Sequence, residues 1–294
     1  MLKVLIIGSE GFVGYNLIDG LSDKFQVLTS DIIKKDISDN YTQCDITNYD
    51  QVINTVKNVD VVINLATHSL LSSLESETEN AQVNIIGLLN ILQACRKNNI
   101  KKIIFTSASS LIGEPQSFKV SENHTTTPKT AYGITKLASE HYLRLFQELY
   151  GINFIVFRFF NIYGSYQKNG LVPSLYQKIT SNQPVTIFGD GKQLRDFVYI
   201  TDVLPFFEKA ISNDSVNNSI YNIGTGIGTT ISEVITLMSD TLGIEPKVER
   251  KPIRKGEIGN FIADTTKLEK SFGQVPNTTV KSGLEKTIEW LRNQ

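Results

Sequence analysis

The chain has 294 residues, a formal net charge of −1 and 40% hydrophobic residues, as expected for an ordinary globular protein. This near-neutral balance gives no electrostatic sign of nucleic acid or an anionic membrane surface as a partner. The apolar start at 2–7 is too short for a signal core, and no apolar run approaches the ~20 residues that span a bilayer. Cys44 and Cys95 form no CxxC pair, so we expect free thiols in a reducing cytoplasm.

Short β-branched runs alternate with longer amphipathic segments in the first half of the chain. The runs are almost continuously apolar, as in a parallel sheet that is covered on both faces. This alternation predicts an α/β fold of the Rossmann type, with a doubly wound parallel sheet. The predicted strands are 4–7, 27–29, 59–65, 102–107 and 153–159, and the predicted helices are 12–21, 80–98 and 130–150.

The regular rhythm ends after Tyr163, where glycines and prolines separate shorter segments. We therefore expect a dinucleotide-binding domain at 1–163 and a smaller substrate-binding lobe at 164–294. A strand and helix at 196–212 and a strand at 220–223 are expected to return to the large sheet. On that reading, 196–223 belongs with the first domain.

A glycine loop, Gly8-Ser9-Glu10-Gly11-Phe12-Val13-Gly14, lies between the first strand and the first helix. Its glycines allow a tight turn and close backbone approach, and the helix N-terminus presents free N–H groups to a pyrophosphate. Asp31 lies about twenty residues further on, at the end of the second strand. A carboxylate there binds ribose hydroxyls and repels a 2′-phosphate, so the pattern favours NAD over NADP.

Tyr132 and Lys136 lie four residues apart near the start of a predicted helix, which puts both side chains on one face. A phenol is a poor base at its usual pKa of about 10. A nearby ammonium and an oxidised nicotinamide would favour the phenolate. The pair is therefore a candidate catalytic base with its activating cation. A surface Tyr–Lys pair is the alternative.

In this order and spacing, the motifs resemble the extended short-chain dehydrogenase/reductase family, specifically its NAD-dependent nucleotide-sugar epimerases and dehydratases. The resemblance covers essentially the whole chain. It implies that Tyr132 and Lys136 are catalytic. It also implies NAD contacts from Gly8, Gly11, Phe12, Val13, Gly14, Asp31, Asp45, Ile46, Leu65, Ala66, Thr67, Asn84, Thr106, Tyr132, Lys136 and Phe159.

Later segments resemble the family's substrate-binding motifs. Asn161, in an RxxNxYG pattern, is implied to contact the nucleotide diphosphate. Arginine suits diphosphate because its fork pairs with phosphate oxygens at fixed geometry. The resemblance implies substrate contacts from Asn161, Leu171, Val172, Ile187, Arg195, Arg254 and Glu257.

The sequence departs from the family after the strand 102–107. Ala108 stands where the family carries a Ser or Thr that hydrogen-bonds the reacting sugar oxygen. Either Ser109 or, as a weaker candidate, Ser107 supplies that hydroxyl, or the site works without it. The following positions, Ser109 and Ser110, hold no carboxylate for eliminating water. The expected reaction is therefore epimerisation at sugar C4, through a transient 4-keto sugar.

Two other functions stay open: a 4-keto nucleotide-sugar reductase, and a catalytically weakened NAD or sugar-nucleotide binder. Phe261 either limits the room for the C2 substituent, which favours UDP-glucose and UDP-galactose, or is a core residue. His68 either contacts substrate or is structural, and the three histidines have no metal-ligand spacing. Family members are commonly homodimers through two long helices per chain, for which 80–98 and 130–150 are the candidates.

Overall fold

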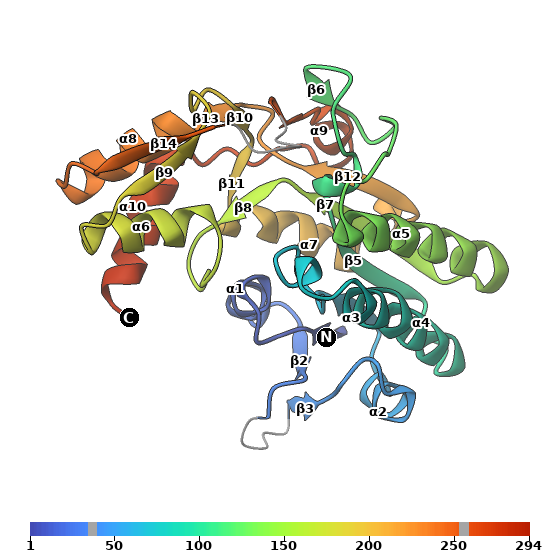
Figure 1. Cartoon of the computed structure of the whole chain (residues 1–294). Coiled ribbons are helices and arrows are strands. Elements are labelled where there is room, and N and C mark those ends of the chain that lie inside the picture. The colour runs from blue at the N-terminus through green and yellow to red at the C-terminus, as the bar shows by residue number, and fades with distance from the viewer. Residues whose placement is uncertain (35–39, 253–258) are drawn as a thin grey trace. The chain divides into compact units, whose positions relative to one another are not determined.

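The computed structural model describes residues 1–34, 40–252 and 259–294 (Figure 1). Contacts divide the chain into two compact units. Unit 1 contains 1–113, 124–159 and 204–221, and unit 2 contains 114–123, 160–203 and 222–294. The boundary after the seventh strand thus lies at 159–160. The segment 114–123 belongs to unit 2, although it precedes that boundary in the sequence.

Among the described residues, the large sheet has seven strands, and the predicted fold class is confirmed. The neighbouring strands pair in parallel from β7 through to β3. Parallel pairing puts the carboxyl ends of these strands at one edge, which is where ligands bind in such folds. In sheet order the strands are β12 (Ser219–Ile223), β7 (Asn153–Phe159), β5 (Lys102–Ala108), β4 (Val61–Asn64), β1 (Lys3–Ile7), β2 (Gln26–Asp31) and β3 (Tyr41–Gln43).

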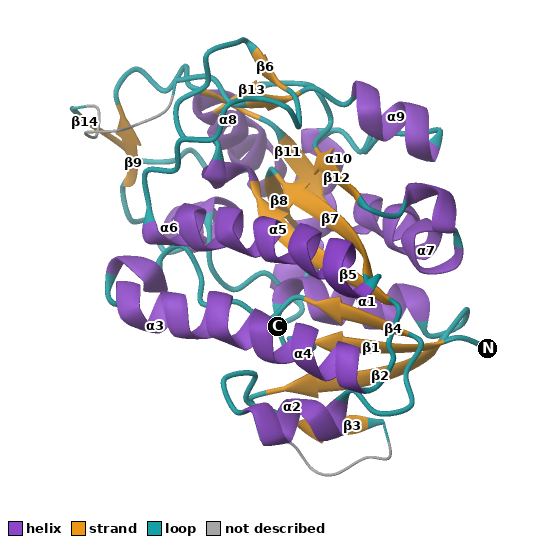
Figure 2. Cartoon of the chain, turned by 90° about the vertical axis from the view of Figure 1, so that its right-hand side faces the viewer, coloured by secondary structure: helices purple, strands orange, loops and turns teal. Residues whose placement is uncertain are grey.

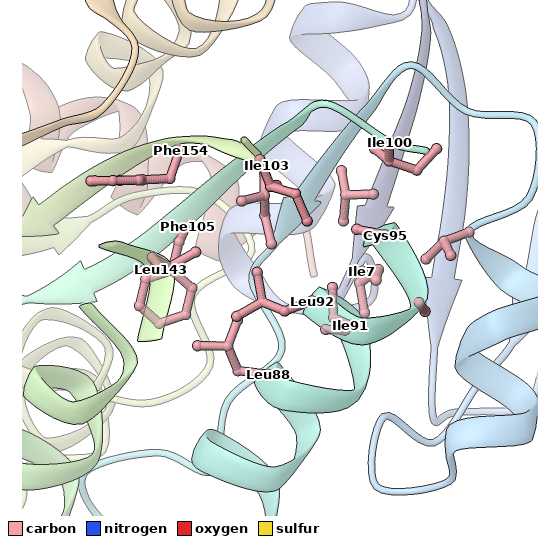
Figure 3. Close-up of a cluster of buried hydrophobic side chains, with 14 of the residues drawn as sticks. Ile7, Leu88, Ile91, Leu92, Cys95, Ile100, Ile103, Phe105, Leu143 and Phe154 are labelled. Carbon is pink, nitrogen blue, oxygen red and sulfur yellow. The ribbon is translucent and has the colours of Figure 1, made fainter. Parts of the chain in front are cut away.

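Helices of unit 1 cover the sheet with apolar side chains. On one face, Leu88, Leu92 and Leu143 pack against Ile103 and Phe105 in the main core (Figure 3). Burying such side chains is the main favourable term in folding. The helices of unit 1 are α1 (Phe12–Leu21), α2 (Tyr49–Thr55), α3 (Glu77–Ala81), α4 (Leu88–Lys97), α5 (Ala131–Tyr150) and α7 (Leu204–Ser212), with short 3₁₀ turns at Ser72–Leu74, Ser109–Leu111 and Asp214–Val216.

Two of these helices, α1 and α7, pack on each other. A Cβ at Gly20 of α1 would lie only 2.6 Å from the side chain of Leu204, so a larger residue there would separate the helices. Phe207 of α7 meets Phe157 of β7 edge to face, with ring centres 5.0 Å apart. Side chains alternate along a strand, so Phe157 lies on the face opposite the core residues Phe154 and Val156.

The helix predicted at 80–98 is continuous but not regular. It runs as α3, then a π-helical segment at Gln82–Gly87, then α4 (Figure 2). Within the π-helical segment, the buried residues are Asn84 and Gly87. π-Helical turns inside α-helices are rare and occur frequently at functional sites.

The described residues of unit 2 form short strands and four α-helices. The strand predicted from 196 does not join the large sheet: Phe197–Tyr199 pairs with Asn161–Tyr163 in a separate two-stranded sheet, whereas 219–223 does join it. No helix in the described ranges is long and apolar enough to cross a membrane. The elements are β6 (Lys119–Val120), β8 (Asn161–Tyr163), α6 (Leu171–Thr180), β9 (Val185–Phe188), β10 (Leu194–Arg195), β11 (Phe197–Tyr199), a 3₁₀ turn (Ile200–Val203), β13 (Thr229–Thr230), α8 (Ile231–Leu242), β14 (Val248–Lys251), β15 (Ile262–Ala263), α9 (Thr266–Phe272) and α10 (Val280–Arg292).

Candidate active site

The start of α5 positions Tyr132 and Lys136. Thr130 caps the helix by accepting a 3.0 Å hydrogen bond from the Gly133 amide, so Tyr132 lies in the first turn. Lys136 follows one turn later, with its Nζ atom 5.5 Å from the centre of the Tyr132 ring. The same Nζ atom donates a 2.8 Å hydrogen bond to the Thr106 carbonyl of β5. The helix therefore holds both side chains on one face, as their spacing predicts.

Burial dominates the acid–base properties of this pair. It raises the pKa of Tyr132 to about 12, and a side-chain hydrogen bond with Thr67 opposes that rise. It lowers the pKa of Lys136 to about 7, against the charge of Glu140, which raises it. The protein's own groups thus hold the phenol protonated at neutral pH. Forming the phenolate requires a further positive charge beside it.

The π-helical segment places Asn84 against the loop after β4. The Oδ1 atom of Asn84 accepts hydrogen bonds from the Thr67 hydroxyl at 3.1 Å and from the His68 amide at 2.8 Å. Its Nδ2 atom donates to the His68 carbonyl at 3.2 Å and to the Thr135 hydroxyl of α5 at 3.1 Å. Asn84 therefore ties the loop that carries Thr67 to the helix that carries Tyr132.

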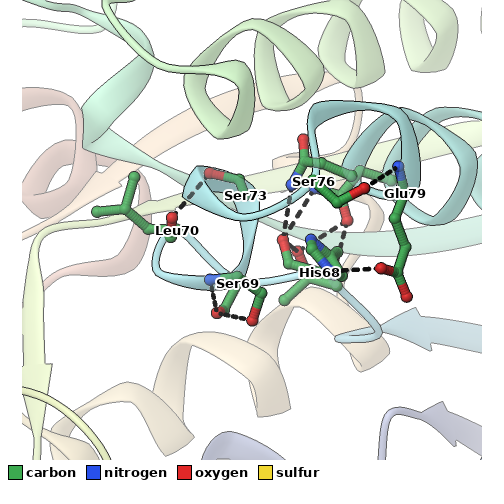
Figure 4. Close-up of polar contacts among 10 residues, drawn as sticks. His68, Ser69, Leu70, Ser73, Ser76 and Glu79 are labelled. Atoms are coloured by element: carbon green, nitrogen blue, oxygen red, sulfur yellow. Dashed lines mark hydrogen bonds and ion pairs between the residues drawn. The ribbon is translucent and has the colours of Figure 1, made fainter.

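His68 is held within this same polar cluster. Its ring points towards Glu79, with Nε2 3.6 Å from Oε2, and its backbone carbonyl also accepts from Asn80 (Figure 4). Nδ1 is buried with no hydrogen-bond partner among the described residues. These contacts agree with the structural alternative for His68. Metal-ligating clusters of three or more side chains do not occur in the described part of the chain.

A buried ion pair lies one turn further along α5. Arg158 of β7 donates to both carboxylate oxygens of Glu140, from Nε at 2.9 Å and from Nη2 at 2.7 Å. Both side chains are only 3% exposed. Ser107 donates a 2.7 Å hydrogen bond to the same carboxylate. The hydroxyl of Ser107 is thus engaged in this pair, which argues against its weaker candidacy as the substrate-binding hydroxyl.

The loop after β5 keeps Ser109 as a candidate. Ala108 ends the strand, and Ser109 begins a 3₁₀ turn that packs beside the start of α5. The carbonyl of Ser110 would lie 2.9 Å from a Cβ at Gly133, so a glycine is needed for this close approach. Thr106 donates a long 3.4 Å hydrogen bond to the Asn64 carbonyl of the neighbouring strand.

The glycine loop follows β1 and lies close to the backbone just after β4. Gly8 has a φ of +86°, and a Cβ there would lie 2.6 Å from the Ala66 amide nitrogen, which follows Leu65. A Cβ at Gly14 would lie 2.4 Å from the Ser9 carbonyl oxygen. Gly11 is the N-cap residue of α1, where no side chain caps the helix and the first turn has no acidic residue. The N–H groups of that first turn, which includes Phe12 and Val13, suit an anion.

Asp31 lies at the end of β2, and Asp45 comes shortly after β3. Asp31 ends β2, and its carboxylate accepts from the amide of Glu10 at 2.9 Å, which links it to the glycine loop. Asp45 accepts from the amide and hydroxyl of Thr47 at 2.9 and 2.8 Å. Ile46 is buried, and its side chain would lie 2.5 Å from a Cβ at Gly87.

In unit 2, a buried carboxylate organises two of the predicted substrate residues. Asp196 is fully buried and accepts hydrogen bonds from Thr225, Gly226 and the Ala263 amide. Burial raises its pKa, and these hydrogen bonds oppose the rise. Its backbone carbonyl accepts from the amide and from Nδ2 of Asn161. The guanidinium of neighbouring Arg195 donates to the Leu194 and Gly259 carbonyls, each at 2.9 Å.

The apolar substrate candidates differ in exposure. Leu171 is 36% exposed at the start of α6, whereas Val172 and Ile187 are buried. Phe261 is 5% exposed and stacks on Phe160 with ring centres 5.2 Å apart, as its core alternative expects. Phe159, at the end of β7, lies 6.4 Å from the Phe207 ring. Arg254 and Glu257 lie outside the described residues.

The sequence predicts no role for Glu140 or Asp196, two buried acidic residues that shape these clusters. Neither lies in a local pattern that marks a buried carboxylate, since Ser139 and His141 flank Glu140 and Arg195 precedes Asp196. The sequence predicts Thr67 as an NAD contact, but its hydrogen bond to Asn84, 17 positions away, has no local signal.

Residues 4–224 match the family described as "NAD dependent epimerase/dehydratase family". The fold is similar to that of Thermotoga maritima UDP-glucose 4-epimerase with UDP-glucose, with a TM-score of 0.92, 30% identity and 99% of each chain covered. The fold is also similar to that of UDP-N-acetylglucosamine 4-epimerase from Methanobrevibacter ruminantium, with a TM-score of 0.91 and 28% identity, covering 99% of this chain and 98% of that one. Bacillus cereus UDP-glucuronic acid 4-epimerase, in complex with UDP-glucuronic acid and NAD, has a TM-score of 0.90, 25% identity and 99% of each chain covered.

Proposed function

The chain belongs to the NAD dependent epimerase/dehydratase family, and on that premise we propose that it is a nucleotide-sugar 4-epimerase. Its first substrate pair to test is UDP-glucose and UDP-galactose. The observation that carries the proposal is the pairing of Tyr132 with Lys136 at the start of α5, beside the carboxyl ends of β4 and β5. A phenol there can exchange a proton with a sugar hydroxyl.

The residues around the glycine loop fit NAD. A side chain at Gly8 or Gly14 would clash with neighbouring backbone, so the glycines allow the close approach, and the uncapped start of α1 suits a pyrophosphate. Asp31 lies at the end of β2 and is bonded to the loop itself. We propose that its carboxylate accepts from the adenosine ribose and disfavours a 2′-phosphate. When bound, NAD supplies a hydride acceptor and donor, and its oxidised ring adds a positive charge.

The protein's part in the chemistry is to hold and move one proton. Tyr132 is protonated in the free protein, because burial raises its pKa. A cation beside the ring, together with the ammonium of Lys136, would stabilise the phenolate by charge attraction. The phenolate then accepts the proton of the sugar 4-hydroxyl as C4 is oxidised. It returns that proton when the 4-keto sugar is reduced on its other face.

We assign diphosphate binding to Asn161 and Arg195, with Arg254 as a third candidate. The guanidinium of Arg195 is oriented by two backbone carbonyls, which reduces the entropy lost when it binds a phosphate. A grip on the diphosphate lets the sugar turn over while the nucleotide stays in place. The fork geometry of arginine suits that role.

Epimerisation fits the loop after β5 better than elimination. Ser109 and Ser110 stand directly after Ala108, and neither can act as the acid or base that removes water across C5–C6. For the sugar, UDP-glucose and UDP-galactose are the first choice because the similar Thermotoga maritima structure is a UDP-glucose 4-epimerase with UDP-glucose.

We further infer a homodimer formed through α4, α5 and the π-helical segment. Ile86, Leu145 and Leu149 are 40%, 42% and 60% exposed on these helices. Leu145 and Leu149 are one turn apart, so they form a continuous apolar strip. The buried free thiols of Cys44 and Cys95 fit a cytoplasmic location.

The test of the function uses purified protein and UDP-galactose with no added cofactor. We expect UDP-glucose to form, and NAD to be released when the protein is denatured. In D₂O, the product should carry no deuterium at C4, because the hydride returns from a bound cofactor. Parallel reactions with UDP-N-acetylglucosamine and UDP-glucuronic acid measure the sugar preference.

Two outcomes would contradict the proposal. Failure to convert any UDP-, dTDP- or GDP-hexose, with NAD still bound, would leave a non-catalytic binder. Net reduction of a 4-keto sugar nucleotide with an exchangeable cofactor would assign the chain as a reductase.

A further inference from the structure

A buried acidic residue of unit 2 lies directly beside the two residues assigned to diphosphate binding. Asp196 is 0% exposed and follows Arg195 in the chain. Its backbone carbonyl accepts hydrogen bonds from the amide of Asn161 at 3.0 Å and from Asn161 Nδ2 at 3.2 Å. Asp196 is therefore joined to one candidate by a peptide bond and to the other by two hydrogen bonds.

The side chain of Asp196 holds this backbone in place. Oδ1 accepts from the amide and the hydroxyl of Thr225, at 2.8 and 2.7 Å, and Oδ2 accepts from the amides of Gly226 at 3.0 Å and Ala263 at 3.1 Å. A Cβ at Gly224 would lie 2.6 Å from Oδ2, so the glycine leaves room for the carboxylate. The carboxylate thus fastens the loop after β12 and the strand β15 to the end of β10.

This arrangement needs an acceptor at both ends of the side chain. A carboxylate has two acceptor oxygens, whereas an asparagine of the same shape would turn an NH₂ group towards some of these donors. A buried donor that loses its acceptor destabilises its surroundings. The positions of the three segments therefore depend on the two oxygens of Asp196 and not on its shape alone.

Asn161 and Arg195 take their places from the backbone that the carboxylate holds. One N–H of Asn161 Nδ2 is donated to the Asp196 carbonyl, which leaves the other to donate to a ligand. The backbone of Arg195 lies beside Phe261, whose amide donates to the Leu194 carbonyl and whose carbonyl accepts from the Asp196 amide. A shift of Asp196 would therefore move both side chains.

We propose that Asp196 is a positioning residue for the nucleotide diphosphate: its buried carboxylate holds the backbone that orients Asn161 and Arg195. The inference rests on the proposed function, which assigns diphosphate binding to these two residues. It adds a residue that does not itself touch the ligand. Because Asp196 acts on binding and not on proton transfer, its loss should change the affinity for a diphosphate more than kcat.

The test measures the affinity of the NAD-loaded protein for UDP, by calorimetry, and for uridine, by NMR titration. Uridine lacks both phosphates. Thr225→Val removes one donor to the carboxylate, Thr225→Ser keeps it, and Asp196→Asn replaces one acceptor oxygen. Thr278→Val is the matched control, because Thr278 donates its amide and hydroxyl to Asp202, another carboxylate of unit 2, at 2.8 and 2.6 Å. Thermal melts report how far each variant is destabilised.

We expect the UDP affinity to fall about threefold to tenfold in Thr225→Val and more than about tenfold in Asp196→Asn, as for weakened hydrogen bonds to a charged group. Uridine affinity should change less than about twofold in both variants, and Thr225→Ser should bind UDP like the wild type. Thr278→Val should lower the melting temperature without changing the ratio of the two affinities. With a substrate that turns over, KM should rise by a larger factor than kcat falls.

Three results would overturn the proposal: a parallel loss of UDP and uridine affinity in Thr225→Val, a UDP affinity in Thr225→Val equal to that of the wild type, or the same change in the affinity ratio in Thr278→Val. The two Thr225 variants decide the outcome even where Asp196→Asn does not fold. Binding needs no turnover. A wild type that binds UDP but converts no sugar nucleotide would remove the epimerase function alone, whereas a wild type that binds UDP no better than uridine would remove the diphosphate assignment and this inference with it.

Discussion

Lys136 joins the helix of Tyr132 to the sheet, because its Nζ atom donates a 2.8 Å hydrogen bond to the Thr106 carbonyl while lying 5.5 Å from the Tyr132 ring centre. The contact sets the lysine beside the phenol without a direct hydrogen bond between them. In the proposed mechanism it acts on Tyr132 through charge, and that charge depends on pH because burial lowers the pKa of Lys136 to about 7.

Tyr132→Phe tests the phenol as the proton acceptor. We expect kcat to fall by roughly 10² to 10⁴, the range for removing a general acid–base group. Binding of UDP-galactose, measured by calorimetry, should change little. Tyr142→Phe on the same helix is the matched control and should keep full activity. Unchanged turnover in Tyr132→Phe would show that another group moves the proton.

Lys136→Met tests the cost of burying the ammonium. The pKa of Lys136 is about 7 in the folded protein, against an ordinary value of 10.5. Between pH 7 and pH 10.5, the unfolded chain therefore binds more protons than the folded one. The free energy of unfolding therefore rises with pH across this window, and the penalty is largest below pH 7. The variant should be more stable than wild type at pH 6.5, by on the order of a few kcal/mol, and nearly equal at pH 10.

Urea unfolding at the two pH values measures this difference. Lys101→Met, at an exposed lysine next to β5, is the control and should show no such pH dependence. A constant gap between wild type and Lys136→Met across the window would contradict the assigned pKa shift. Loss of turnover in the more stable variant would show that the buried cation is retained for activity.

Glu140→Gln tests the buried ion pair. Its removal leaves the guanidinium of Arg158 buried without a carboxylate, at a cost of roughly 3–5 kcal/mol in the free energy of unfolding. The exposed residue Glu148 lies on the same helix, and Glu148→Gln should change stability by less than about 0.5 kcal/mol. Urea denaturation at pH 7 measures both. Equal small effects would mean that Arg158 finds another partner.

Leu145→Lys and Leu149→Lys test the inferred dimer. A charge in the apolar strip of α5 should give a monomer by light scattering, whereas the wild type should be a dimer. Ile227→Lys changes a residue of unit 2 that is 69% exposed, and it should leave the dimer intact. A wild type that is monomeric at all concentrations would reject the inference outright.

The features of this fold that depend on local residue patterns could be predicted from the sequence. The helix predicted at 12–21 begins and ends at the observed residues, because a glycine loop precedes it and an apolar stripe runs its length. The spacing of Tyr132 and Lys136 was enough to put them on one face. The resemblance of the motifs to the epimerase family is confirmed by the matched residues 4–224.

The features that could not be predicted from the sequence depend on contacts between residues far apart in the chain. The strand Phe197–Tyr199 has the composition of a central strand, yet it pairs with β8 outside the large sheet. The Glu140–Arg158 pair joins positions 18 apart on different elements. The position of Thr67 depends on its hydrogen bond to Asn84. The direction of the Asn84 side chain is set by an irregular backbone geometry that the residue pattern does not predict.

That geometry is the π-helical segment Gln82–Gly87. The helix is less regular there, and in exchange Asn84 is directed towards the loop after β4. A chain shortened by one residue here could form an unbroken α-helix, with better backbone hydrogen bonds. Because the wider π turn accommodates the extra residue, the deletion would leave the α-helical residues on either side in register. The residues inside the turn, Asn84 among them, would lose their present directions, while Leu88 and Leu92 could keep their places in the core. An evolving or engineered chain could therefore gain a more stable helix at this point only by uncoupling it from the loop beside Tyr132.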